Sequence, residues 1–298
     1  MIFVLTFIFS VFSWGLACYG ALGNPNFVHP KGKKQPLNSL HHPATLTNLE
    51  VRKVRDIACG YGYSIFAAKH QNGHLLGCGI NNFGQIGYHE IKPNSPLQVL
   101  IVPSSIKLPV KSAEDFVTRV ECGQSHTIVL TNLGEIFSLG SNAYGQCGRP
   151  VIEDEDYLNS KVIYSVKIPE LESDDEIIDL ECGINHSMFL SKKGCVFSCG
   201  WSADGQTGLG HYDNQSQPKK LEGDIKGEKI VKVSCVADNV LALNGEFKNG
   251  LFCHFLRKID VNRASVPEQP KTALDGVSIF APKTITKKAD CVTLNRKL

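Results

Sequence analysis

Cysteine is the residue type in this 298-residue chain whose number and spacing most suggest chemistry, as a metal ligand, a nucleophile or half of a disulfide. The chain has 11 cysteines, and Cys59, Cys122, Cys182 and Cys235 occupy one equivalent place in a repeated pattern. Equivalent places in successive units are usually too far apart for a disulfide, and a free thiol packs as a small apolar side chain. No CxxC pair exists, and we therefore predict structural thiols rather than zinc ligands. An odd count favours a reducing compartment.

Histidine shows the same regularity. His126 and His186 stand three residues after a repeated glycine, and Tyr63 has that place in an earlier copy. A ring with a polar tip in every copy predicts an internal hydrogen bond rather than catalysis. No Ser-His-Asp or Cys-His set can be chosen without arbitrariness, and the phosphate-binding pattern GxxxxGK[ST] is missing. The sequence thus predicts a non-enzymatic protein without a metal or cofactor.

Two acidic stretches are the remaining charged motifs. Their default interpretation is a solvated loop, but partner-binding residues of repeat proteins often lie on such loops. Acidic loops could meet a basic protein surface. The net charge of +2, from 31 basic and 29 acidic residues, gives no reason to expect DNA. The candidate partner-binding residues are Glu153, Asp154, Glu155, Asp156, Asp174 and Asp175.

These residues are positioned by a repeat of about 60 residues, which outranks any local motif. Three copies run Cys59–Gly87, Cys122–Gly148 and Cys182–Gly208, with a clipped half-copy at Val11–Gly23 and a damaged copy at Val233–Gly245. The repeated structural positions are Gly60, Gly79, Gly87, Gly123, His126, Gly140, Gly148, Gly183, His186, Gly200 and Gly208.

The second copy shows the expected local structure. Val117–Cys122, His126–Thr131 and Glu135–Leu139 read as strands, with a tight hairpin at Leu133-Gly134 where a positive φ is needed. A glycine-bounded loop, Gly140–Gly148, follows. Three or four short antiparallel strands in each repeat indicate the blades of a β-propeller.

The residues also carry a resemblance. The pattern G-x-x-H-[ST]-x-x-L followed by G-x-N-x-x-G-Q-x-G resembles the repeat of the regulator-of-chromosome-condensation family. In the second copy it is matched by Gly123, His126, Thr127, Leu130, Gly140, Asn142, Gly145, Gln146 and Gly148. The family's members close seven blades, whereas this chain offers about three complete repeats. We therefore expect an all-β, partial propeller of three to four blades, and an apparently truncated form.

The amino-acid sequence of Trp14–Gly23 and Gly79–Gly87 is similar to that of the mitochondrial branch of the family. The resemblance implies a guanine-nucleotide exchange factor for a dynamin-type GTPase of the mitochondrial inner membrane, active in mitochondrial fusion. Association with the membrane would come through that partner. It also implies a role with mitochondrial large-subunit ribosomal RNA. The alternatives are an RNA-binding assembly factor without exchange activity and a secreted or luminal binding propeller.

The expected organisation has four parts. Residues 1–23 form the clipped half-repeat, 24–50 a proline-containing insert, 51–245 the repeat array, and 246–298 a divergent, partly disordered tail. The apolar run Ile2–Ala17 admits three interpretations: a strand-like segment, a signal or anchor segment, or a damaged mitochondrial targeting segment. We expect pieces such as Leu251–Leu256 to supply a substitute strand, and most of Val261–Leu298 to be poorly ordered.

Overall fold

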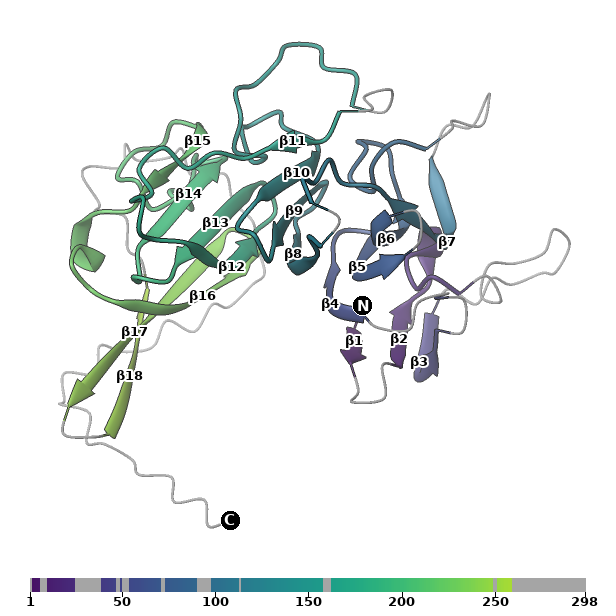
Figure 1. The fold of residues 1–298 in the computed structure, drawn as a ribbon, viewed down its shortest axis with the longest axis horizontal. Coiled ribbons are helices and arrows are strands. Elements are labelled where there is room, and N and C mark those ends of the chain that lie inside the picture. The colour runs from purple at the N-terminus through teal and green to yellow at the C-terminus, as the bar shows by residue number, and fades with distance from the viewer. Residues whose placement is uncertain are drawn as a thin grey trace, which may run out of the picture. The chain divides into compact units, whose positions relative to one another are not determined.

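A computed structural model describes residues 2–5, 10–24, 39–46, 49, 54–70, 73–89, 98–112, 114–157, 162–248 and 251–258. These residues all belong to one compact unit, Met1–Asn262. The unit is built from antiparallel strands, which confirms the all-β prediction and the partial propeller (Figure 1). The helical segments in this part of the chain are short 3₁₀ turns, among them η1 (Cys18–Gly20) and η3 (Gly223–Ile225).

The strands form five meandering sheets, here called blades 1 to 5, in which each strand pairs with the next along the chain. Blade 1 contains β1 (Ile2–Leu5), β2 (Val11–Leu16) and β3 (Ser39–Thr45). Blade 2 contains β4 (Val54–Cys59), β5 (Tyr63–His70), β6 (Gly73–Ile80) and β7 (Val99–Ile106). Blade 3 contains β8 (Val117–Cys122), β9 (His126–Thr131), β10 (Ile136–Gly140) and β11 (Tyr164–Ser165). Blade 4 contains β12 (Ile177–Cys182), β13 (His186–Ser191), β14 (Val196–Gly200) and β15 (Gln215–Lys220). Blade 5 contains β16 (Ile230–Val236), β17 (Asn239–Lys248) and β18 (Leu251–Lys258).

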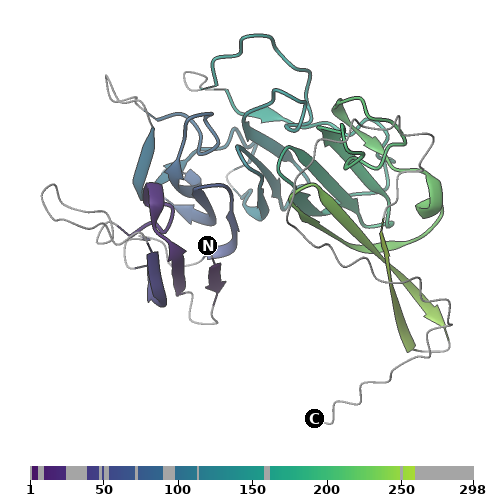
Figure 2. The same cartoon turned by 180° about the vertical axis from the view of Figure 1, so that it is seen from behind.

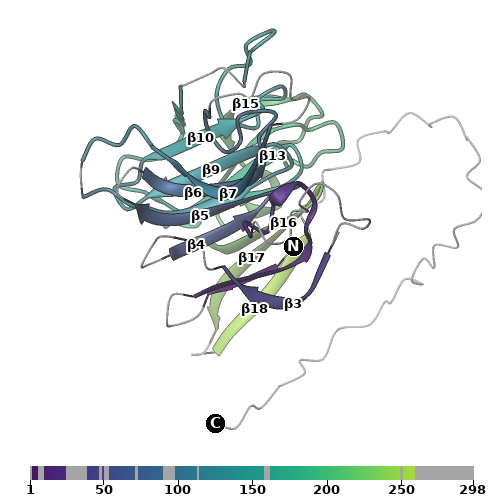
Figure 3. The same cartoon turned by 90° about the vertical axis from the view of Figure 1, so that its right-hand side faces the viewer.

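The second strand of each complete blade is buried on both faces. Successive side chains of a strand point to opposite faces. Accordingly Val129 of β9 packs in the core shared with blade 2, while Ile128 and Leu130 pack in the core shared with blade 4. In β13, Phe189 and Met188 divide in the same way. The continuous apolar runs in these strands therefore reflect contacts with two neighbouring blades, which follow one another in the ribbon seen from behind and from the side (Figures 2 and 3).

The fifth blade departs from this rule. Leu241 of β17 has the place of Ile128 and Met188, both 1% exposed, yet it is 43% exposed. Its neighbour Ala242 is 1% exposed and packs against blade 4. One face of β17 is thus buried and the other lies open.

The predicted strands of the second repeat are confirmed, with Glu135–Leu139 shifted by one residue to Ile136–Gly140. Gly134 takes the predicted positive φ, at 76°, and Gly194, at the same place in the next repeat, has a φ of 90°. Part of the expected insert, Ser39–Thr45, forms β3, because β2 offers it an edge with which to pair. Leu251–Lys258 supplies the expected substitute strand by pairing with β17. The prediction for Val261–Leu298 lies outside the described residues.

Two ends of each blade follow from the antiparallel order of the strands. The turns from the first to the second strand and the glycine-rich loops after the third strand share one end, here called the glycine-loop end. For example, Ser141 N–H donates to Ser125 O at 2.8 Å. The tight hairpins at 132–134 and 192–194 and the links between blades share the other, the hairpin end, where Ile230 N–H donates to Gly194 O at 3.1 Å.

Candidate interaction surface

The rings at the repeated histidine position of blades 2 and 3 bind each of these blades to the next. The Tyr63 hydroxyl of blade 2 donates to His126 O of blade 3 at 2.5 Å. His126 Nε2 lies 2.9 Å from Ser187 Oγ of blade 4. Burial, reinforced by nearby His186, lowers the pKa of His126 to about 3, so its imidazole is neutral at physiological pH. The predicted internal hydrogen bond thus crosses between blades.

The residue after the ring carries a hydroxyl that binds the preceding blade. Ser64 Oγ donates to Ala21 O at 2.7 Å, Thr127 Oγ1 to Gln85 O at 2.9 Å, and Ser187 Oγ to Gln146 O at 2.7 Å. Each acceptor is a carbonyl in the glycine loop of the preceding blade. The hydroxyl joins blades 1 and 2, and ring and hydroxyl together join blades 2 and 3 and blades 3 and 4.

The junction between blades 4 and 5 lacks this hydroxyl. Val240 has the place of Thr127 and Ser187, since it pairs with Cys235 as Ser187 pairs with Cys182. Buried His186 Nε2 consequently has no hydrogen-bond partner in the described structure, and its Nδ1 has none either, as is also true of His126 Nδ1. Burial lowers the pKa of His186 to about 4.

The glycines of the pattern are required by close approach of the backbone. Gly140 has a φ of +94°, and a Cβ on it would lie 2.3 Å from Ser125 O. A Cβ on Gly123 would lie 2.1 Å from the His126 ring. Within the loop, Gln146 Oε1 accepts from Tyr144 N–H and Asn142 Oδ1 accepts from Cys147 N–H, at 2.9 and 3.0 Å. The glycines, Asn and Gln of the motif therefore build a rigid loop.

The four repeated cysteines lie at the end of the first strand in blades 2 to 5. Cys122 and Cys182 are buried, Cys235 is half-buried and Cys59 is exposed. The eight cysteines whose side chains the structure describes are free thiols. Burial raises the pKa of the Cys122 and Cys182 thiols well above the usual range, so these thiols stay protonated. No group of three or more metal-ligating side chains occurs among the described residues.

The first acidic stretch lies on the loop between β10 and β11, the teal loop at the top of Figure 1. Glu153, Asp154 and Asp156 are exposed. The Glu155 side chain is 8% exposed, and its Oε1 accepts from Arg149 Nη2 at 2.6 Å. The Arg149 guanidinium also stacks on the Tyr164 ring at 4.0 Å from its centre. Glu155 thus closes its own loop, while the other three carboxylates face solvent.

The second acidic stretch serves the hairpin of its own blade. Lys193 Nζ lies 2.5 Å from Asp174 Oδ1 and 2.7 Å from Glu172 Oε2. Asp175 Oδ1 accepts from Lys193 N–H at 3.1 Å. This stretch is at the hairpin end, whereas Glu153–Asp156 is at the glycine-loop end. The structure therefore does not bring the six predicted residues together on one surface.

A line of charges on the innermost strands escaped the sequence reasoning. Glu121 and Glu181 occupy one repeat position, and Arg119 Nε lies 3.3 Å from Asp179 Oδ1 on the adjacent strand. Burial, with Glu181 and two aspartates nearby, raises the pKa of Glu121 to about 8. The pattern is visible in the aligned strands VRDIAC, VTRVEC and IIDLEC, whose third place is charged in all three and whose fifth place is glutamate in the last two.

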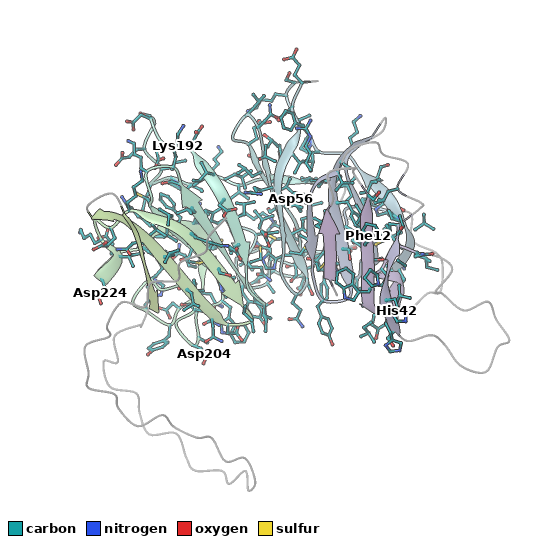
Figure 4. The ribbon with its side chains drawn as sticks, turned by 90° about the horizontal axis from the view of Figure 1, so that it is seen from below. Phe12, His42, Asp56, Lys192, Asp204 and Asp224 are labelled. Carbon is teal, nitrogen blue, oxygen red and sulfur yellow. The ribbon has the colours of Figure 1, made fainter. Side chains whose placement is uncertain are left out.

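Aromatic side chains also gather at the glycine-loop end. The rings of Tyr144 and Trp201, from the loops of blades 3 and 4, meet edge to face with centres 4.4 Å apart. Tyr212 in the second of these loops is 50% exposed. Figure 4 labels Asp204 of that loop and Lys192 of the β13–β14 hairpin, which lie at opposite ends of blade 4.

None of the helices in the described residues is long and apolar enough to span a bilayer.

The repeat can be compared with known families. The profile of the Regulator of chromosome condensation (RCC1) repeat matches residues 10–67, 72–130, 134–190 and 193–243. A second profile of the same repeat matches residues 117–146 and 177–206. The chain belongs to the RCC1 repeat family. Each matched repeat of this family carries the last two strands of one blade and the first two of the next, so four repeats complete only blades 2, 3 and 4.

Relatives in the family are similar over most of this chain. The RCC1-like G exchanging factor-like protein of Mus musculus is 38% identical over 245 residues, which cover 79% of this chain and 52% of the relative. The Homo sapiens protein of that name is 37% identical over 251 residues, which cover 81% and 53%. The chain therefore spans about half the length of these relatives.

Solved structures agree with the assignment. The crystal structure of human WBSCR16 superposes with a TM-score of 0.69 at 38% identity, covering 79% of this chain and 58% of that one. Prp20p of Saccharomyces cerevisiae superposes with a TM-score of 0.59 at 20% identity, covering 76% and 50%, and supports the fold alone.

Proposed function

We propose that this protein is a non-enzymatic regulator of a GTPase, acting as a guanine-nucleotide exchange factor or as part of one. The proposal is supported chiefly by its similarity, at 37–38% identity, to two proteins named as G exchanging factor-like. The structural roles of the repeated histidines and cysteines agree with this proposal. His126 binds across a junction between blades, and Cys122 and Cys182 are buried thiols.

Exchange needs no covalent chemistry. A partner that binds the nucleotide-free GTPase more tightly than the nucleotide-bound form lowers the affinity for nucleotide by the same factor, because the two equilibria are linked. A rigid surface of suitable shape and charge is sufficient. The fastened blade junctions and the braced glycine loops supply such a surface.

We further propose that the GTPase is of the dynamin type and that the protein acts in the mitochondrion, in fusion of the inner membrane and beside the assembly of the large ribosomal subunit. The resemblance of Trp14–Gly23 and Gly79–Gly87 to the mitochondrial branch supports this assignment. The eight free thiols fit a reducing compartment better than a secretory one.

The test is the release of fluorescent GDP from a purified dynamin-type GTPase of the mitochondrial inner membrane. We expect release to accelerate in proportion to added protein until it saturates, while a small GTPase of another class, loaded in the same way, is unaffected. An unchanged release rate would refute exchange by this chain. Crosslinking to large-subunit ribosomal RNA in that case would favour the assembly factor.

A further inference from the structure

The two ends of blade 4 treat their carboxylates differently. At the hairpin end, Glu172 and Asp174 are paired with Lys193, and Glu176 with Lys192, at 2.5 to 2.7 Å. At the glycine-loop end, Asp204 and Asp213 are exposed and form no ion pair in the described structure. At the hairpin end these three carboxylates therefore have lysine partners, whereas the glycine-loop end leaves two carboxylates for an outside cation.

Aromatic residues lie on the same loop as these two carboxylates. Tyr144 and Trp201 meet edge to face, and Trp201, Asp204, Tyr212 and Asp213 all come from the single loop between β14 and β15. Exposed tyrosine and tryptophan are typical of binding surfaces, where they give a large contact area at a small cost in conformational entropy. Trp201 is half-buried; its indole N–H is buried and has no partner among the described residues.

The combination selects a kind of partner. Arginine and lysine stack on the faces of aromatic rings, and their charged groups form hydrogen bonds with carboxylates. A nucleic acid would bring phosphates against Asp204 and Asp213, which repel them, whereas nucleic-acid binding depends on basic side chains. The neighbouring loop adds the exposed carboxylates of Glu153 and Asp154. This surface therefore suits a basic protein segment.

We propose that the surface formed by Tyr144, Trp201, Asp204, Tyr212 and Asp213, here called the blade 4 loop face, binds an arginine- or lysine-bearing segment of a partner protein. A cation of the partner stacks on the rings while Asp204 and Asp213 neutralise it. The inference rests on the proposed role as a partner-binding propeller and does not depend on which GTPase is bound.

The experiment uses the full chain with Trp14 replaced, Trp14→Phe, so that all indole fluorescence comes from Trp201. The probes are a soluble Arg-Gly-Ser repeat peptide, a Glu-Gly-Ser peptide of the same length, and poly(U) RNA. We expect saturable quenching by the arginine peptide only. Its affinity should fall about fivefold in Tyr212→Ser, which removes a ring that is already half exposed and so leaves folding intact.

A matched pair of charge variants locates the site. We expect Asp204→Asn with Asp213→Asn to weaken binding at least as much as Tyr212→Ser does. Asp174→Asn with Glu176→Gln removes the same number of carboxylates from the hairpin end and should leave the affinity unchanged.

Three results would overturn the proposal. They are equal quenching by the glutamate peptide or poly(U), no quenching by any probe, and a greater loss from the hairpin-end variant than from the loop-face variant. The assay contains no GTPase, so a negative exchange experiment leaves its outcome untouched. Active exchange without peptide binding would place the GTPase contact elsewhere on the propeller.

Discussion

Val240→Thr should repair the junction between blades 4 and 5. The substitution keeps the β-branched shape that β17 requires and adds the hydroxyl that Thr127 and Ser187 provide at the preceding junctions. His186 Nε2 would then gain a partner as His126 Nε2 has in Ser187, at 2.9 Å. The hydroxyl would in turn donate to Gln206 O, which has the place of Gln146 O.

The size of the effect follows from the groups involved. Two hydrogen bonds contribute about 0.5–1.5 kcal/mol each, and losing one buried methyl group costs about 0.8 kcal/mol. The net gain in the free energy of unfolding should be about 1 kcal/mol. For a domain of this size, that raises the melting temperature by about 2–4 °C.

Thermal melting and amide hydrogen exchange of β17 measure the gain. Val240→Ala removes methyl groups without adding a hydroxyl, so it should lower stability. In a His186→Phe background, Val240→Thr should lose the part of its benefit that comes from the ring, since the interaction energy of a pair vanishes when one partner is missing. The reasoning fails if Val240→Thr behaves like Val240→Ala, or if its full benefit persists with Phe at residue 186.

Three further predictions concern other parts of the molecule. The pKa of Glu121 is raised from 4.5 to about 8, so the folded state favours the protonated carboxyl and stability falls as pH rises through this interval. Glu121→Gln should therefore raise the melting temperature at pH 8 and change it little near pH 4.5. An equal change in melting temperature at both pH values would contradict this prediction. Gly140→Ala forces a side chain against a backbone carbonyl at positive φ and should lower the free energy of unfolding by more than about 2 kcal/mol. Gly134→Ala, with nothing within 4 Å of the new Cβ, should lower it by about 1 kcal/mol. Urea unfolding compares the two variants, and equal losses would refute the role of close backbone approach at Gly140. Glu155→Ala breaks a buried ion pair and should lower the free energy of unfolding, measured in the same way, by about 3 kcal/mol. The exposed control Glu153→Ala should lie within about 0.5 kcal/mol of the wild type. A Glu155→Ala variant as stable as the wild type would refute the buried pairing.

Much of the fold could be predicted from residue patterns alone. The recurrence of Gly123, His126 and Gly140 in later copies indicated a repeat, and the hairpin at Gly134 placed strands to within one residue. These features are local, because a positive φ and the alternation of strand faces depend on neighbours close in the chain. The acidic stretches were recognised as loops for the same reason.

The interaction surface could not be predicted in this way, because it depends on which ends of the strands lie together. Glu153–Asp156 and Asp174-Asp175 look alike in sequence, yet the antiparallel meander puts them at opposite ends of the blades. Burial then separates Glu155 from its neighbours through Arg149. Sequence reasoning also missed Asp204 and Asp213, since their lack of an ion pair becomes visible only beside the lysine-paired carboxylates of the hairpin end.

The sequence by itself determined the repeated unit, its strands and its family, because glycine geometry and apolar alternation act over a few residues. Tertiary structure alone decided how those units join. A junction depends on pairs such as His126 with Ser187, some 60 residues apart, and on whether the partner position holds a hydroxyl or, as at Val240, a methyl group. The sequence shows that the histidine and the hydroxyl recur, but a side chain meets its partner in the next blade only after both blades have folded, so which residues pair is decided by the tertiary structure.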